Sequence, residues 1–167
     1  MNKPVRYLLQ AINLGLFMLL IAAFSSGPAV KQLEADEAVV TLAFGHAGQP
    51  VRECRARTPE ELAALAPNMR APMDCPRERS VIKVLLEMDG EEVFNLDAHP
   101  PGAFKDQGVD VYHSIIVPAG KHRFTVRLND SALIEGYNHT GEYEADLAPA
   151  QLLFIDFNAG MGGFIFN

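Results

Sequence analysis

The sequence predicts a mainly β protein in which an antiparallel β-sandwich follows one N-terminal transmembrane helix. Three observations predict this architecture. An uncharged apolar run lies near the N-terminus, apolar and polar residues alternate in several segments after residue 38, and turn-forming residues recur about every eight to twelve positions. With 167 residues, the chain has room for one compact domain of about seven or eight short strands besides the helix.

The N-terminal segment has the length and composition of a membrane anchor. Residues 7–24 carry no charge, and a helix of that length rises about 27 Å, close to the hydrocarbon thickness of a thin bilayer. A cleaved signal peptide also has a basic start and an apolar middle, but this run is longer than the usual signal core. Lys3 and Arg6 precede the run and acidic residues follow it, which places the N-terminus in the cytoplasm. The expected parts are a cytoplasmic tip and inner-membrane anchor (1–27), a stalk (28–38) and a periplasmic domain of bacterial type (39–167).

One side of the expected helix carries its polar residues. Gln10, Asn13 and Phe17 are spaced i, i+3 and i+7 and therefore share a stripe. Polar groups in lipid are costly unless they bond to a neighbour, so the stripe favours contact with another membrane helix. In the alternative interpretation, Gln10 lies near the end of the helix and only reaches toward the membrane surface.

Beyond the stalk, nearly every segment has the period-2 pattern of a strand. The expected strands are about 39–44, 81–88, 92–96, 109–117, 122–128, 142–147, 152–157 and 163–166. Asp89-Gly90 is a strong hairpin turn signal. The segment 152–157 is apolar on both faces, which predicts a central or covered strand. The acidic stripe of 142–147 is expected to pair with Arg123 and Arg127 on a neighbouring strand.

A short helix interrupts the β pattern. Thr58-Pro-Glu-Glu61 is typical of a helix start, because Thr58 can cap the helix while Glu61 returns the capping hydrogen bond. Such a short helix is not stable alone in water. Cys54 and Cys75 flank it and are expected to form a disulfide in an oxidising compartment. Closing this loop is worth about 3 kcal/mol in the chain-entropy model, so residues 54–75 are expected to form one stapled excursion.

A short segment carries the one resemblance to known proteins. Residues 115–126, Ile-Ile-Val-Pro-Ala-Gly-Lys-His-Arg-Phe-Thr-Val, resemble the strand, Pro-x-Gly turn and strand of PEGA-like bacterial surface modules. The resemblance implies an Ig-like or PEGA-like sandwich with a binding or scaffolding role and no catalytic residue. The stapled excursion is not part of that pattern.

Several classes of activity find no support in the sequence. There is no Gly-x-Ser-x-Gly elbow, and the glycines at 160–163 are not followed by the Lys of a phosphate-binding loop, so we expect no enzyme and no catalytic residue. With 14 basic and 21 acidic residues, the net charge of −7 argues against nucleic acid as a partner. A carbohydrate-binding role receives little support because the chain has no Trp.

The segment around the second cysteine is the candidate partner-binding loop. Arg with Met is the composition favoured at protein interfaces, and the candidate residues are Met69, Arg70, Met73, Arg77 and Arg79. The alternative is a solvated loop whose arginines pair with Asp74 and Glu78. The leading hypothesis is therefore a periplasmic accessory subunit, or assembly partner, that binds an integral inner-membrane protein complex through its membrane helix and its periplasmic domain, with no cofactor.

A second hypothesis is a periplasmic copper-handling protein that assists assembly of a respiratory oxidase. Thioether, thiolate and imidazole groups are ligands that Cu(I) prefers, and the candidate ligands are Met69, Met73 and His122, with the other histidines (46, 99, 113 and 139) as further donors. Against copper, a disulfide removes the thiolate of Cys75. His113 and His122 are interpreted as histidines that either lie at the edge of the core or form hydrogen bonds, rather than as ligands.

Overall fold

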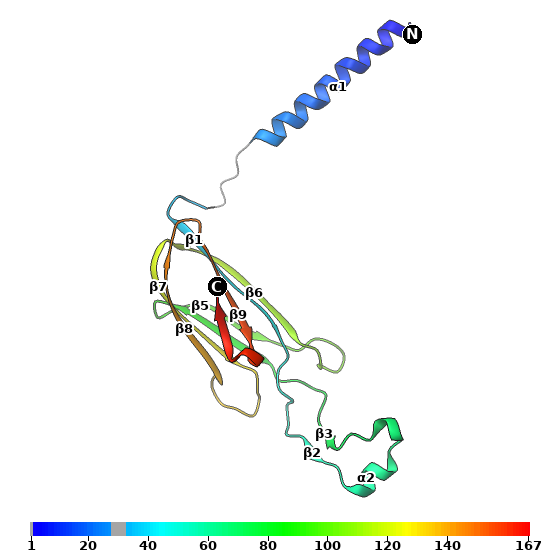
Figure 1. Ribbon diagram of the computed structural model, residues 1–167, viewed down its shortest axis with the longest axis vertical. Helices are drawn as coiled ribbons and strands as arrows, with labels where there is room; N and C mark the ends of the chain where they lie inside the picture. Colours follow the sequence, from blue (N-terminus) through cyan, green and yellow to red (C-terminus); the bar gives the residue numbers. More distant parts are fainter. Residues whose placement is uncertain (1, 28–32) are drawn as a thin grey trace. The chain divides into compact units, whose positions relative to one another are not determined.

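The computed structural model describes residues 2–27 and 33–167, so residues 28–32 of the expected stalk lie outside the described residues (Figure 1). The chain divides into two compact units, Met1–Glu34 and Ala35–Asn167. Helix and sandwich belong to different units, and each is described by itself.

The described part of the first unit contains one helix, α1 (Lys3–Ser26), which extends beyond the apolar run at both ends. Pro4 lies in its first turn, where the missing N–H of proline costs no hydrogen bond. The helix contains no buried residue and is long and apolar enough to cross a membrane. Gln10, Asn13 and Phe17 lie on one side of it because of the helical period.

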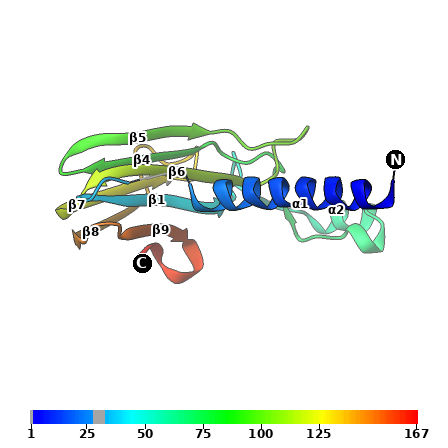
Figure 2. The same ribbon diagram turned by 90° about the horizontal axis from the view of Figure 1, so that it is seen from above.

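The second unit is a sandwich of two four-stranded sheets, seen as two layers in Figure 1 and along their strand order in Figure 2. The first sheet has the order β10 (Gly163–Phe166), β9 (Leu152–Asn158), β1 (Glu37–His46) and β6 (Val109–Pro118). The second sheet has the order β5 (Glu91–Ala98), β4 (Ile82–Met88), β7 (Gly120–Asn129) and β8 (His139–Leu147). The predicted mainly β sandwich of seven or eight strands is confirmed, although β1 already begins within the expected stalk.

One strand pair departs from the predicted antiparallel arrangement. β9 pairs with β1 in parallel, with Val39 opposite Leu152. Strand β8 ends at the same end of the sandwich where β1 begins. The turn that follows β8 contacts the start of β1, because Ala150 donates its N–H to the carbonyl of Glu37 (2.7 Å). β9 therefore starts beside the start of β1 and runs in the same direction. As its two apolar faces predict, it lies between two other strands.

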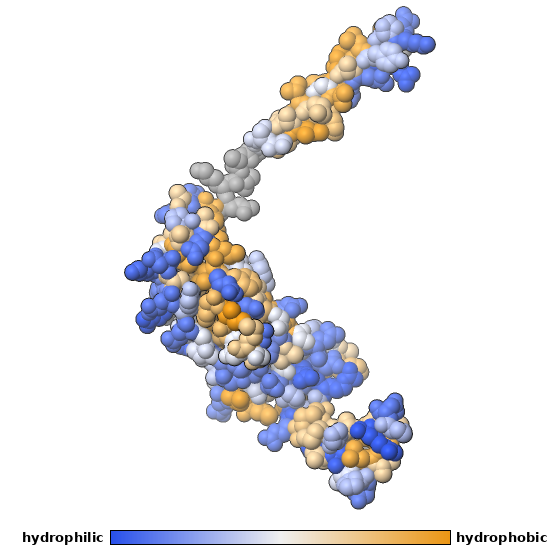
Figure 3. Space-filling view, viewed as in Figure 1, coloured by the Kyte–Doolittle hydropathy of each residue, from blue (hydrophilic) through white to orange (hydrophobic). Residues whose placement is uncertain are grey.

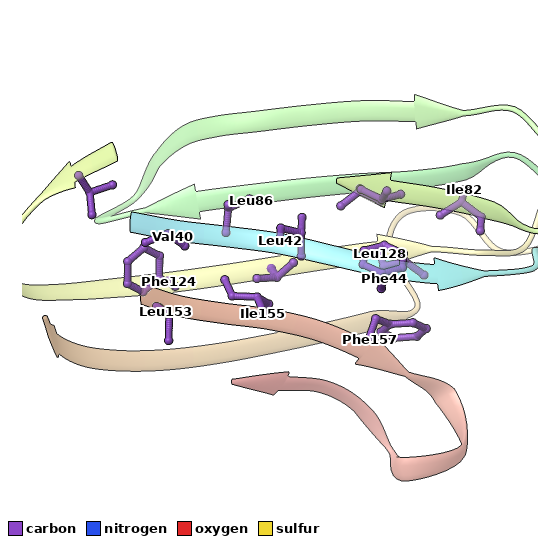
Figure 4. Close-up of a cluster of buried hydrophobic side chains, with 14 of the residues drawn as sticks. Val40, Leu42, Phe44, Ile82, Leu86, Phe124, Leu128, Leu153, Ile155 and Phe157 are labelled. Carbon is purple, nitrogen blue, oxygen red and sulfur yellow. The ribbon is translucent and has the colours of Figure 1, made fainter. Parts of the chain in front are cut away.

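The core lies between the two sheets and is built by period-2 alternation. Val40, Leu42 and Phe44 of β1 point inward and meet side chains such as Leu86 and Phe124 from the second sheet (Figure 4). Each of these five residues is buried. Burying a side chain of this size contributes about 1.5–3 kcal/mol, so the sandwich has its own source of stability.

Aromatic stacks close both long edges of the sandwich. Phe94 of β5 stacks on His113 of β6, with ring centroids 4.1 Å apart, and Tyr143 of β8 stacks on Phe166 of β10 at 4.9 Å. Each stack joins the edge strand of one sheet to the edge strand of the other. His113 is thus a packed histidine at the edge of the core, as expected.

The predicted hairpin and half of the predicted charge pairing are present. Asp89 and Gly90 both have positive φ (55° and 88°), the backbone of a two-residue type I′ turn. Arg123 binds Glu144 of β8 through two of its nitrogens, as expected. The expectation for Arg127 was wrong: its partner is Glu87 of β4 (3.1 Å), because Arg127 lies opposite Thr140 in the β8 ladder and reaches to the other neighbouring strand.

The two ends of the sandwich carry different parts of the chain. The N-terminal end comprises residues 35–37, 118–120 and 148–151, and there Ala119 donates to the carbonyl of Asp36 (2.7 Å). The loop end comprises residues 46–51, 78–81, 99–108 and 130–138. β1 is ten residues long, so the two ends are separated by roughly 30 Å at 3.3 Å per residue. The stapled excursion leaves from the loop end (Figure 1).

Candidate functional site

The stapled excursion (residues 54–75) has the local structure that its sequence predicts. It contains β2 (Arg55–Ala56), α2 (Pro59–Ala64), the 3-10 turn η1 (Pro67–Met69) and β3 (Met73–Asp74). Glu61 N–H donates to the Thr58 hydroxyl (3.3 Å), while Thr58 N–H donates to the Glu61 carboxylate (2.9 Å). Cys54 and Cys75 form the predicted disulfide. β2 and β3 pair next to that bond, so the two ends of the excursion are held together twice.

Ion pairs rather than apolar contacts organise the interior of the excursion. Asp74 forms ion pairs with Arg57 (2.7 Å) and with Arg55 (3.2 Å), and Arg55 forms a further ion pair with Glu61 (3.0 Å). Hydrogen bonding to Glu61 and its charge raise the pKa of Arg55, and the same hydrogen bond lowers the pKa of Glu61. Exposed pairs of this kind contribute little to stability. The excursion therefore depends mainly on its covalent bond.

The excursion presents apolar and cationic side chains to solvent. None of residues 54–75 is buried, and Met69 and Met73 are 61% and 46% exposed. Apolar and charged residues are intermixed over this part of the surface (Figure 3). Residues 52–79 contain six Arg, no Lys and five acidic residues, although the whole chain is strongly acidic. The excursion together with its flanking residues therefore lacks the acidity of the rest of the protein.

The arginines of the candidate loop do not have the partners that the solvated-loop interpretation expects. Arg70 donates to the carbonyl of Leu65 (3.0 Å). Arg77 pairs with Asp106 at 2.5 Å and lies over the ring of Phe104, 4.6 Å from its centroid. Asp74 is occupied by the arginines of β2 and its flank, and Glu78 by Lys105. The expected pairing with Asp74 and Glu78 is therefore wrong, because both acids already have other partners and Asp106 is nearer to Arg77.

The base of the excursion is fixed to the loop end of the sandwich. Ser80 N–H donates to the Gln49 carbonyl (2.8 Å), and Gln49 N–H donates to the carbonyl of Asp130 (2.7 Å). The Ser80 hydroxyl accepts the N–H of Ala132 (2.9 Å). A Cβ at Gly48 would lie 2.3 Å from the Ser80 carbonyl oxygen, so the two chains approach as closely as only glycine permits. The excursion therefore projects from a rigid base.

A buried carboxylate lies directly behind this base. Asp130 is 1% exposed, and its carboxylate accepts hydrogen bonds from His46 Nε2 (2.8 Å), Asn138 Nδ2 (2.7 Å) and Gln49 Nε2 (3.4 Å). His139 Nε2 lies 3.7 Å from the same carboxylate and forms an ion pair when it is protonated. Burial opposes ionisation of Asp130, but the hydrogen bonds from His46, Asn138 and Gln49 and the attraction of His139 outweigh it and lower the pKa of the carboxyl. Asp130 thereby joins β1, the base of the excursion and the loop 130–138.

A groove of about 620 Å³ opens beside the base of the excursion. Its walls include Arg79, Lys83, Lys105, Glu135 and Tyr137. The Nε of Arg79 is buried without a hydrogen-bond acceptor. The backbone N–H of Arg79 donates to the carbonyl of Lys105 (2.9 Å), but an unsatisfied buried donor costs about 1–3 kcal/mol, so the Nε of Arg79 does not contribute to stability.

The structure does not bring the copper candidates together. His122 lies near the N-terminal end of the sandwich, where its nitrogens contact Asp89 (2.7 Å) and the Pro118 carbonyl (3.0 Å). Met69 and Met73 belong to the excursion, which leaves from the loop end. Both cysteines are in the disulfide, and among the described residues no three His, Cys, Asp or Glu side chains form a metal-binding group.

Sequence reasoning identified the excursion but missed the residues that hold it. No pattern in the sequence indicates a role for Asp130, and nothing in the spacing of His46 and His139 indicates that both face one carboxylate. Comparisons with known proteins add no assignment, because no family model, no curated protein and no solved structure matches this chain.

Proposed function

We propose that this chain is a bacterial inner-membrane protein whose periplasmic domain binds a protein partner: a non-catalytic accessory subunit or assembly partner of an integral membrane complex. The single observation that carries the proposal is the construction of the excursion. A segment that buries no residue contributes little to the core, yet it is closed by a disulfide, capped at its helix and fixed to a rigid base. Such a rigid, exposed segment is suited to binding, because little conformational freedom is lost when a partner binds.

The chemistry of the excursion indicates the kind of partner surface. Methionine side chains adapt to irregular apolar surfaces, and arginine forks bind carboxylates. Among residues 2–27 and 33–167, Arg52 and Arg79, which flank the excursion, form no ion pair, and Arg70 within it binds only a backbone carbonyl. The excursion therefore fits a protein surface that combines apolar and acidic side chains.

The anchor and the disulfide support the proposed compartment. α1 is long and apolar enough to span a bilayer, and its basic N-terminus favours an orientation with the sandwich outside the cytoplasm. Disulfides persist in that compartment. A reporter active only in the periplasm, fused after Asn167, should be active. Activity of a cytoplasmic reporter at the same position would contradict the proposed orientation.

Site-specific photocross-linking in native membranes tests the binding role. A photoreactive residue in place of Met69 should give one discrete adduct with an integral membrane protein. Met161 is the matched control, since it is a methionine at 74% exposure outside the excursion. Absence of an adduct from position 69, or the same adducts from both positions, would refute a binding role for the excursion.

A further inference from the structure

The two outer faces of the sandwich have opposite character. Side chains that point away from the core on the second sheet are mostly charged: Lys83, Glu87, Lys121, Arg123, Arg127, Glu142, Glu144 and Asp146. They give the hydrophilic left margin of the sandwich in Figure 3. This face has the composition of an ordinary wet sheet surface.

The outer face of the first sheet is apolar instead. The residues of β1 and β9 alternate with the buried core positions, so the outward set is fixed by the same period that builds the core. The outward apolar residues are Val39, Ala43, Tyr112, Ile116, Leu152, Phe154 and Ile165. Tyr112 is 74% exposed, and Ile116 and Leu152 are 55% exposed each.

Strand register gathers these residues into one continuous patch, called here the apolar face. Val39 lies opposite Ile116 on one side and Leu152 on the other, which gives a row of three apolar side chains across three strands. The next row holds Thr41, whose hydroxyl lies 3.0 Å from that of Ser114. The outward side chains of this sheet include no Lys or Arg and only two acids, Asp110 and Asp156, within residues 39–45, 110–116, 152–156 and 165.

We infer that the apolar face is a self-association surface on which a second copy of this chain packs, sheet against sheet. Two features of the face favour a second copy. The chain has a net charge of −7, so two copies repel one another least where the surface carries the fewest charges. Exposed Tyr and aliphatic side chains with few charges are also the composition of the central part of homodimer interfaces.

The size of the apolar face matches this occupant. β1 and β6 have ten residues each, β9 has seven and β10 has four, so with about 4.8 Å between strands and 3.3 Å per residue the sheet covers roughly 500 Å² per copy. A face-to-face pair then removes about 1,000 Å² in total from water, which is the size of a weak, specific interface. The expected complex is a dimer that forms readily only when the copies are concentrated.

The proposed membrane anchor supplies that concentration and selects one orientation, a step that rests on the proposed function. A two-fold axis parallel to the strands leaves the N-terminal ends of both sandwiches on the same side, as two anchors in one membrane require. An axis across the strands would place them on opposite sides. Confinement in one membrane raises the effective concentration of the copies, which favours a weak interface of this size.

The test is the mass of the full-length chain purified in detergent and followed through a dilution series. Ile116→Lys and Leu152→Lys each place a charge on the apolar face at a position that is already half exposed. Each should weaken dimerisation at least tenfold without lowering the melting temperature. Leu133→Lys is the matched control, because Leu133 is 56% exposed but lies in the loop 130–138. It should dimerise like the unaltered chain.

A helix variant separates the sandwich from the anchor. Gln10→Leu/Asn13→Leu removes the polar stripe of α1 and should leave the dimer intact. The inference is overturned if the unaltered chain is monomeric at every concentration, if the three Lys variants behave alike, or if the helix variant alone abolishes the dimer. None of these measurements involves the partner or the compartment, so they remain informative even if the proposed function is wrong.

Discussion

Asp130 and His46 are 84 residues apart in sequence, yet their side chains form a 2.8 Å contact behind the base of the excursion. The contact joins the end of β1 to the start of the loop 130–138. Phe157 packs edge-on against both His46 and His139, with ring centroids 5.0 Å apart in each pair. The polar network at the loop end is therefore continuous with the apolar core.

The first prediction concerns acid stability. The pKa of Asp130 is lower in the folded chain than its ordinary value, so folding favours the ionised carboxylate. This contribution is fully present above about pH 3.9, the ordinary value for Asp, and is lost as the pH falls through the folded-state value. Asp130→Asn should lower the free energy of unfolding near pH 7 and reduce its slope below about pH 4. Urea unfolding at a series of pH values measures both.

Glu142→Gln is the control for acid stability. Glu142 is exposed on the outer face of the second sheet, and its loss should leave the low-pH slope almost unchanged. An Asp130→Asn variant whose stability follows pH as the unaltered chain does would show that the buried network does not determine acid stability.

The sandwich was predictable because alternation is a local property of the sequence. The Asp89-Gly90 hairpin and the inward set of β1 follow from residues that are neighbours in the chain. The parallel pairing of β9 with β1 could not be read in this way. It is set by contacts between residues 148–151 and the start of β1, which are more than 100 residues apart in sequence.

The disulfide gives the second prediction. In the chain-entropy model, a loop of this size stabilises by about 3 kcal/mol, provided that the looped segment is ordered in the folded state. Residues 54–75 bury nothing, so without the bond they should become disordered while the sandwich stays folded. Cys54→Ser/Cys75→Ser should therefore lower the unfolding free energy by well under about 3 kcal/mol.

Limited trypsin digestion locates the same change. Arg57 and Arg70 lie within the excursion and should become the first cleavage sites in the double Ser variant, whereas the unaltered chain should resist. Reduction of the unaltered chain should reproduce the pattern. A large loss of global stability, or cleavage first within the sandwich, would show that the excursion is integrated with the core.

The third prediction concerns the close approach at Gly48. A Cβ there would lie 2.3 Å from a backbone oxygen, which cannot move without shifting the base of the excursion. Gly48→Ala should destabilise the domain by about 1–3 kcal/mol, the usual cost of overpacking, as measured by urea unfolding. Gly45→Ala is the control, because its Cβ would meet only the flexible carboxylate end of Asp110 (2.8 Å) and should cost much less. Equal effects would contradict a rigid base.

In the candidate site, as in the fold, the sequence predicts features formed by residues close in the chain and does not predict contacts between distant ones. The capping box at Thr58 and the cystine are short-range features and were predicted correctly. The partners of Arg77 and Arg127 were not, because Asp106 and Glu87 come from separate elements that only the folded chain brings near. The contrast between the two outer faces was likewise invisible until strand order showed which outward residues share a sheet.

The last prediction separates stability from binding at Arg79. Its Nε is a buried donor without an acceptor, and lysine has no equivalent group. Arg79→Lys keeps the positive charge in the groove and removes the unsatisfied donor, so the free energy of unfolding should stay equal or rise by up to about 1 kcal/mol. Arg70→Lys, at an exposed position, should leave stability unchanged.

If Arg79 is retained for binding, Arg79→Lys should nevertheless weaken the photocross-link from position 69, because lysine cannot form the two parallel hydrogen bonds to a carboxylate. A marked loss of stability in Arg79→Lys would show that the guanidinium supports the fold, and would remove Arg79 from the proposed partner-binding set.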